Sequence, residues 1–190
     1  MKIGLINPKP LLSPDVAIPQ GLLSISAELK RNGYKCEIID YCNPDVKESY
    51  SHLNKFDVIG LSVMTTQLHH AAAIAEKLDK HVKVVWGGIH CLLNPLSILN
   101  KFKNQFVISG EGEIPLVKLL DYFDGKETYE SLINQKGVCL HNGQPIINKP
   151  YFIKQPDSLA DIDFYDLPML EKYIYKNLYY VYIHYFAIKV

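Results

Sequence analysis

The chain has 190 residues, and its 20 basic and 20 acidic side chains give a formal net charge of zero at pH 7. No block of lysine or arginine interrupts this balance, so we expect no nucleic-acid partner. No run of about 18 apolar residues occurs, and the N-terminal apolar run is too short for a signal peptide. We therefore expect a cytoplasmic protein that does not enter the membrane, with one main domain and an appendage.

Five apolar segments with little polar alternation are typical of strands that are covered on both faces. These segments are Lys2–Asn7, Lys35–Asp40, Val58–Ser62, Val82–Trp86 and Phe106–Ser109. Helical spacing of apolar residues occurs in Gln20–Arg31, Asp45–Leu53, Leu68–Lys80, Leu96–Lys101 and Glu113–Phe123. The alternation predicts an α/β fold, a flavodoxin-like (Rossmann-like) doubly wound sheet of five parallel strands that binds ligands at the strands' carboxyl ends.

The pattern changes after residue 125, which divides the chain into three predicted parts. Residues 1–125 form the α/β domain, 126–150 a small hairpin extension and 151–190 an irregular linker. Asn142-Gly143 lies between two apolar stretches and is typical of a type I′ hairpin turn. Gly33 is expected to end the first helix in a left-handed conformation.

The cysteines and histidines predict no metal site. The four cysteines form no C-x-x-C pair and are expected to be buried thiols; they are Cys36, Cys42, Cys91 and Cys139. His69 and His70 are adjacent, point about 100° apart on a helix and are expected in solvent or in a loop. His90 follows the glycine pair of the fourth strand, and a lone loop histidine is more often a hydrogen-bonding residue than a ligand.

Two common functions of such folds lack their motifs. The loop after the first strand, NPKPLLSPDVAIPQG, has neither a glycine-rich phosphate fingerprint nor an acidic cluster. A flavin or dinucleotide site of that kind is therefore poorly supported, and a phosphoacceptor domain would need an aspartate where the third strand ends in Ser62. After the fifth strand, Gly110 and Gly112 form half of a nucleotide loop, but a tight turn explains them equally, with Glu111 and Glu113 suiting the helix dipole.

Small residues gather at three neighbouring strand ends: Gly60 with Ser62, Gly87 with Gly88, and Gly110 with Gly112. Absent side chains along adjacent strands would leave a slot between sheet and helices for a large ligand that lies against the backbone. Three hydroxyls follow the third strand and could equally cap the next helix; they belong to Ser62, Thr65 and Thr66.

Four motifs in order make the chain resemble the cobalamin-binding domain that precedes the barrel in cobalamin-dependent radical S-adenosylmethionine (SAM) enzymes. They are PQGLLSISAELKRNGYKCEIID (Pro19–Asp40), DVIGLS (Asp57–Ser62), WGGIH…P (Trp86–Pro95) and SGEGE (Ser109–Glu113). The resemblance covers about the first 125 residues, and Leu159–Pro168 is similar to the family's linker into the barrel.

The resemblance implies where cobalamin binds. Its nucleotide tail would lie in a groove beside Ser62, Gly87 and Gly88, and any side chain at those glycines would fill the groove. The corrin ring would rest over the strand ends, near the first loop and the segment that follows the third strand. The implied cofactor-binding residues are Asn7, Pro8, Ser62, Val63, Thr65, Thr66, Gly87, Gly88, His90, Gly110, Glu111 and Gly112.

Two departures from related families shape the expectation. The first loop lacks the D-x-H-x-x-G motif that supplies a lower axial histidine, so cobalamin is expected to bind base-off. His90 lies on a different loop and is not expected to be a cobalt ligand. The last cysteine is Cys139, so the chain cannot build the C-x-x-x-C-x-x-C cluster site of a radical SAM barrel. SAM and the four-iron four-sulfur cluster are expected only in a full-length enzyme, and Tyr179–Val190 is interpreted as a truncated start of the barrel or as an altered tail.

The leading hypothesis is therefore the cobalamin-binding module of a radical SAM methyltransferase or cyclase, not catalytic by itself, with cobalamin and a radical SAM catalytic domain as partners. The alternative is a degenerate domain that keeps the fold, binds no cofactor and serves as an interaction surface. The missing axial motif is compatible with both.

Overall fold

A seven-stranded sheet forms the middle layer of the part of the chain that the computed structural model describes, residues 1–12 and 17–173. The strand order is β2-β1-β3-β4-β5-β6-β7. The first five strands are parallel: β1 (Ile3–Asn7), β2 (Cys36–Asp40), β3 (Val58–Ser62), β4 (Lys83–Gly87) and β5 (Phe106–Ile108). The predicted doubly wound parallel core is confirmed.

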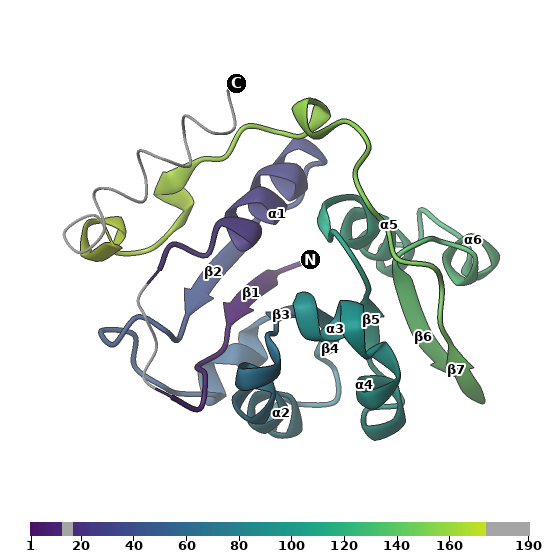
Figure 1. Ribbon diagram of the computed structural model, residues 1–190, viewed down its shortest axis with the longest axis horizontal. Helices are drawn as coiled ribbons and strands as arrows, with labels where there is room; N and C mark the ends of the chain where they lie inside the picture. The colour runs from purple at the N-terminus through teal and green to yellow at the C-terminus, as the bar shows by residue number, and fades with distance from the viewer. Residues whose placement is uncertain (13–16, 174–190) are drawn as a thin grey trace.

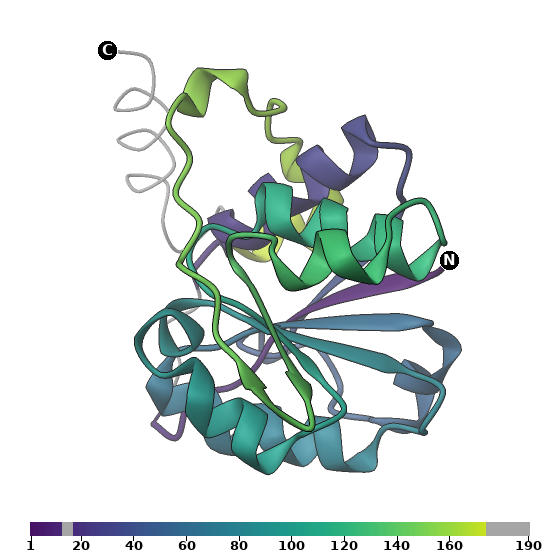
Figure 2. The ribbon, with the colours of Figure 1, turned by 90° about the vertical axis from the view of Figure 1, so that its right-hand side faces the viewer.

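Helices cover both faces of this sheet and make three layers (Figures 1 and 2). One face carries α1 (Gln20–Arg31), α5 (Glu113–Phe123) and α6 (Tyr129–Ile133), and is called the α1/α5 face below. The other carries α2 (Leu68–Lys77), α3 (Ile89–Leu93) and α4 (Pro95–Lys101), and is called the α2/α4 face.

The two sides of each strand feed two separate apolar cores because successive side chains of a strand point to opposite faces. In β1, Ile3 and Leu5 pack under α1 and α5, whereas Ile6 packs under α2. In β4, Val85 takes the α1/α5 face, while Trp86 is buried on the α2/α4 face and stacks on Phe102 at 5.0 Å between ring centroids. Burial on both faces explains why the strands read as continuous apolar runs.

The predicted hairpin is present, but it belongs to the main sheet. Strands β6 (Val138–Asn142) and β7 (Gln144–Ile146) flank Gly143, which has a φ of +70° as the predicted turn requires. Val138 of β6 pairs antiparallel with Ile108 of β5. The expectation of five strands is therefore corrected to seven in the described residues, and no break in the sheet separates the hairpin from the α/β domain.

One predicted helix is wrong and one cap is confirmed. Between residues 45 and 53 the described chain has only the 3₁₀ turn Ser51–Lys55. Asn43 explains this, because its side chain accepts the Asp45 N–H at 3.0 Å and turns the chain where a helix would start. Gly33 has a φ of +83° just after α1, and the Tyr34 N–H donates to the Leu29 carbonyl at 2.9 Å, as in a Schellman motif.

The segment after the hairpin returns across the molecule. Residues 156–173, called the strap below, include two 3₁₀ turns, Pro156–Ser158 and Phe164–Asp166, and run along α1 toward the end of β2 (Figure 1). The strap is irregular, as predicted, but Leu167 and Tyr173 are buried in the core under α1. The predicted segment Tyr179–Val190 lies outside the described residues. Among the described helices, none has the length and apolarity needed to cross a membrane.

Candidate functional site

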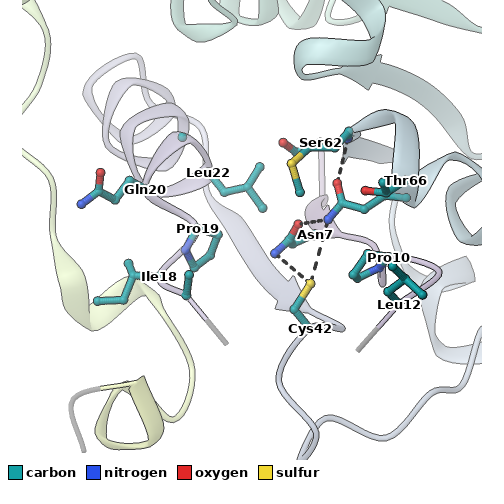
Figure 3. A pocket seen from close by; sticks show the side chains of 14 residues that line it. Asn7, Pro10, Leu12, Ile18, Pro19, Gln20, Leu22, Cys42, Ser62 and Thr66 are labelled. Atoms are coloured by element: carbon teal, nitrogen blue, oxygen red, sulfur yellow. Dashed lines mark hydrogen bonds between the residues drawn. The ribbon is translucent and has the colours of Figure 1, made fainter. Parts of the chain in front are cut away.

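A cavity of about 560 Å³ lies where β1 and β3 end and α1 begins (Figure 3). Such a volume falls within the range of about 300 to 1,000 Å³ that small-molecule sites occupy. The cavity wall comes from the first loop, the start of α1, the end of β3 and the turn that follows it. It is lined by Asn7, Pro10, Leu12, Ala17, Ile18, Pro19, Gln20, Gly21, Leu22, Cys42, Ser62, Met64, Thr66 and Gln67.

Three polar side chains form one side of the cavity and hold one another by hydrogen bonds. Gln67 donates from Nε2 to Asn7 Oδ1 at 2.9 Å and to the Pro8 carbonyl at 2.7 Å. Asn7 Nδ2 contacts Cys42 Sγ at 3.4 Å, and the Cys42 thiol donates to the Pro8 carbonyl at 3.3 Å. Burial raises the pKa of Cys42 to about 12, so this thiol keeps its proton at neutral pH and is a donor rather than a nucleophile.

The sheet surface beside the cavity is open at the end of β4. Ser62 pairs in register with Gly87, and both point to the α1/α5 face, as Val85 does two residues before Gly87. A Cβ built on Gly87 would meet only the Leu61 carbonyl, at 3.9 Å. Open space therefore lies over the strand next to a residue that lines the cavity.

Gly88 has a different role from the one expected. Its φ of +88° and ψ of −178° suit glycine alone, and a Cβ there would lie 2.5 Å from the Val63 nitrogen. The Val63 N–H donates to the Gly87 carbonyl at 2.8 Å, and the His90 N–H donates to the Val63 carbonyl at 3.0 Å. The expectation that a side chain at Gly88 would fill a ligand groove is wrong, because the backbone of Val63 occupies that place.

The end of β5 is filled by the chain itself. A Cβ on Gly110 would lie 2.1 Å from the Tyr151 carbonyl oxygen, and Glu111 bonds through its carboxylate to the N–H of Ile153. Gly112 lies against Ile25 of α1, which a Cβ would approach to 3.1 Å. The predicted slot across the ends of β3, β4 and β5 therefore narrows to the ends of β3 and β4, next to the cavity at the end of β1.

The remaining predicted residues lie around the cavity without lining it. Val63 and Pro8 are buried, and Thr65 is exposed and bonds through its hydroxyl to Nδ1 of His90 at 3.2 Å. Nε2 of His90 lies 3.1 Å from the Ser97 hydroxyl, so hydroxyl groups occupy both ring nitrogens. None of the hydroxyls expected to cap the next helix does so. Gln67 instead accepts the Met64 N–H at 2.8 Å and closes the 3₁₀ turn Thr65–Gln67 that precedes α2.

His70 departs from the expectation for a solvent or loop residue. Its Nδ1 accepts the backbone N–H of Lys9 at 2.8 Å, and its Nε2 lies 3.1 Å from the Tyr50 hydroxyl and 3.2 Å from Glu48 Oε1. Because Nδ1 is an acceptor, the neutral ring carries its proton on Nε2. Burial lowers the pKa of His70 below its ordinary value and favours this neutral form.

Sequence reasoning found Asn7, Ser62 and Thr66 of the cavity but missed Cys42 and Gln67 as site residues. Cys42 follows the end of β2 by two residues and Gln67 follows β3, so both come from strand carboxyl ends. That position was a usable signal for both residues. The apolar part of the wall, including Ile18 and Leu22, carries no such signal, because apolar residues at the start of a helix are ordinary core residues.

A doubly wound sheet with a cavity at the carboxyl ends of its strands defines a Rossmann-like ligand-binding domain. The B12 binding domain family matches residues 13–120, more than half of the chain, and the chain belongs to this family. The predicted resemblance to a cobalamin-binding domain is thereby confirmed. No curated protein sequence matches the chain.

Three solved structures with a similar fold are of radical SAM enzymes. The cobalamin-dependent radical enzyme OxsB, solved with aqua-cobalamin bound, aligns with a TM-score of 0.73 and 18% identity over 90% of this chain. The radical SAM methyltransferase TsrM from Kitasatospora setae, solved with cobalamin and a four-iron four-sulfur cluster, aligns with a TM-score of 0.63 and 18% identity over 85% of this chain. The same enzyme, solved with tryptophan and a SAM analogue, aligns with a TM-score of 0.64 and 19% identity over 78% of this chain. The chain spans only 25% to 31% of the length of these proteins.

Proposed function

We propose that this chain binds cobalamin, with the nucleotide tail in the cavity beside α1 and the corrin ring over the strand ends. The observation that carries the proposal is the open strand surface at Gly87, in register with Ser62 of the cavity wall, in a chain of the B12 binding domain family. The proposed contacts are Asn7, Ser62, Thr66 and Gly87 from the predicted set, joined by Cys42 and Gln67.

The residues present fit such a ligand. Amide and hydroxyl groups of Asn7, Gln67 and Thr66 suit the polar groups of a nucleotide tail, and Ile18 and Leu22 suit its aromatic base. Leu11 and Leu12 of the first loop are 72% and 81% exposed, which favours a large apolar body covering them. A macrocycle over the strand ends would do so.

We further propose that cobalamin is held base-off, with no histidine of this chain below the cobalt. No histidine lines the cavity formed by the described residues. The ring nitrogens of His70 and His90 are engaged elsewhere, with Lys9 and Tyr50 and with Thr65 and Ser97 respectively. Bound cobalamin would supply a cobalt centre able to carry a methyl group.

The structural neighbours support the further proposal that the module works within a radical SAM enzyme of the methyltransferase or cyclase type. SAM and the iron–sulfur cluster would then bind to a catalytic domain, because the four cysteines of this chain lack the cluster spacing. The contribution of this chain would be to hold and orient the cofactor.

The first test is retention of hydroxocobalamin by the purified protein after desalting, followed by its absorption spectrum. We expect retained corrin bands and, after reduction, a base-off cob(II)alamin spectrum. Cobinamide, which lacks the nucleotide tail, should bind at least ten-fold more weakly than cobalamin. A protein that retains no corrin would favour the cofactor-free interaction domain, and equal affinity for both corrinoids would contradict the placement of the tail.

Gly87→Leu tests the site within a folded protein, because the added side chain meets open space rather than backbone. We expect unchanged folding and at least a ten-fold loss of cobalamin affinity. The matched control is Lys83→Leu, at the opposite end of the same strand and on the same face, which should leave the affinity unchanged. Equal affinities for the two variants would contradict a ligand at the end of β4.

A further inference from the structure

The strap, residues 156–173, is fastened to α1 along its length before it reaches the sheet. Ser26 donates to Asp166 Oδ2 at 2.7 Å, and Lys30 forms an ion pair with the other oxygen of the same carboxylate. The Ala160 N–H donates to the buried carboxylate of Glu28 at 3.3 Å. These contacts bring the last described residue, Tyr173, to the carboxyl end of β2, where it is 1% exposed.

Tyr173 meets a carboxylate that lies just behind the cavity. Its hydroxyl donates to Asp40 Oδ2 at 2.7 Å, 133 residues away in the sequence. Asp40 ends β2 and is itself buried, and its Oδ1 accepts the Cys42 N–H at 2.9 Å and Asn7 Nδ2 at 2.9 Å. Three donors from three segments thus converge on one carboxylate.

The Asp40 carboxylate decides which way the Asn7 amide faces. A carboxylate only accepts hydrogen bonds, so it requires the NH₂ end of the amide, while Gln67 Nε2 donates to the oxygen end at 2.9 Å. A flipped amide would place two acceptors together at Asp40 and two donors together at Gln67. Asn7, Cys42 and Gln67 line the cavity, whereas Asp40 and Tyr173 do not.

We propose that Tyr173 and Asp40 are positioning residues for the cofactor cavity: the tyrosine hydroxyl holds the Asp40 carboxylate, which orients the Asn7 amide toward the ligand. The inference rests on the proposed function of the cavity as a cobalamin site. Burial raises the pKa of Asp40, which adds to the need for partners on both of its oxygens. Because coupling between two sites is reciprocal, cobalamin in the cavity and the strap on α1 stabilise each other.

The test is a double-mutant cycle on the affinity for hydroxocobalamin with Tyr173→Phe, Asn7→Ala and the double variant, at a temperature where urea titrations show all three folded. Coupling between two linked sites typically changes affinity about 5- to 150-fold, so we expect Tyr173→Phe to weaken binding at least about five-fold. Asn7→Ala removes a side chain that lines the cavity and should weaken binding at least as much. The double variant should bind no more weakly than Asn7→Ala alone, because both act through one amide.

Tyr165→Phe is the matched control, since this tyrosine lies in the same strap with 89% of its surface exposed and should bind like wild type. A Tyr173→Phe protein that loses stability but keeps full affinity would overturn the proposal, because the hydroxyl would then serve folding alone. The proposal would also be overturned if Tyr173→Phe and Asn7→Ala weakened cobalamin binding independently, so that the double variant lost the product of the two fold-changes in affinity.

A measurement without cofactor separates this inference from the proposed function. The side-chain NH₂ signals of Asn7 in a ¹⁵N spectrum should shift in Tyr173→Phe and stay in place in Tyr165→Phe. If wild-type protein bound no cobalamin yet these signals shifted, the proposed function would fail and the positioning by Tyr173 would stand. If the signals did not move, the positioning would fail whatever the protein binds.

Discussion

Gly88 and Val63 interlock the loops that follow β4 and β3, since a side-chain carbon on Gly88 would lie 2.5 Å from the Val63 nitrogen and 2.8 Å from its carbonyl oxygen. The Val63 N–H and carbonyl are both bonded to the loop that carries Gly88. The two glycines therefore have different roles: Gly88 lets the backbone of Val63 pack closely against it, and Gly87 leaves the sheet surface open.

Gly88→Ala should destabilise the protein by at least about 1 to 3 kcal/mol, the cost of holding a side chain in a strained backbone region, with the clash against Val63 added. Gly87→Ala is the control and should change stability by less than about 0.5 kcal/mol, because its Cβ meets no close atom. Urea unfolding of both variants measures the difference. Equal stabilities would contradict the interlocked loops.

Acid should weaken the anchoring of the first loop through His70. Its pKa is lowered in the folded protein, so the folded state holds fewer protons than the unfolded chain, whose histidine titrates near pH 6.5. This contribution to stability is complete above about pH 6.5 and is lost as the pH falls through the lowered folded pKa. Protonation of Nδ1 removes the bond from the Lys9 N–H, worth about 1 kcal/mol.

The measurement is the urea midpoint at pH 7.5 and pH 5.5 for wild type and His70→Gln. The wild type should lose more stability between the two values than the variant does. His69→Gln, an exposed neighbour on the same helix, should behave like wild type. If wild type and His70→Gln have the same pH dependence, His70 does not anchor the loop.

At lower pH, protonation of Glu48, which contacts His70, should further reduce the stability of the fold. The hydrogen bond that its carboxylate accepts from the Tyr50 hydroxyl, and to a smaller extent the one from the Lys9 ammonium, lower the pKa of Glu48 to about 2. Because this pKa is lower in the folded protein than in the unfolded chain, Glu48 contributes its full share of the folding stability above the ordinary glutamate pKa. That contribution is lost as the pH falls from there toward about 2. Glu48→Gln should therefore lose less stability than wild type between pH 5 and pH 3. A variant with the wild-type acid response would exclude this role.

His90 should prove structural. It is buried, and its ring joins the turn at Thr65 to α4 at Ser97. His90→Ala should cost about 1 to 3 kcal/mol, because two hydrogen bonds of the buried ring are lost, each worth about 0.5 to 1.5 kcal/mol. The absorption spectrum of bound cob(II)alamin should stay as in wild type. A changed spectrum would instead indicate that His90 acts at the cobalt.

Leu167 of the strap should matter as much as a residue of the sheet. It is 2% exposed and packs in the core under α1, so Leu167→Ala should cost about 2 to 5 kcal/mol. Tyr165→Ala, two residues earlier and exposed, should be nearly neutral. If the two variants unfold at the same urea concentration, the strap is not part of the core.

The sequence by itself determined the parallel core of the fold. Runs buried on both faces, such as Val58–Ser62, contain so few polar residues that only a covered strand suits them, and Gly33 marks a helix end by its local conformation. Those features depend on neighbours in the sequence. The helix expected at residues 45–53 failed because Asn43 competes for backbone groups and starts a turn instead.

The tertiary structure alone decided which small and polar residues serve the cavity. Whether a glycine such as Gly87, Gly88 or Gly110 faces open space or a neighbouring chain depends on segments up to about 40 residues away, and no local pattern records that distance. The bond between Tyr173 and Asp40 spans 133 residues and was equally hidden. Local propensity fixes elements, whereas packing between distant segments fixes the space left for a ligand.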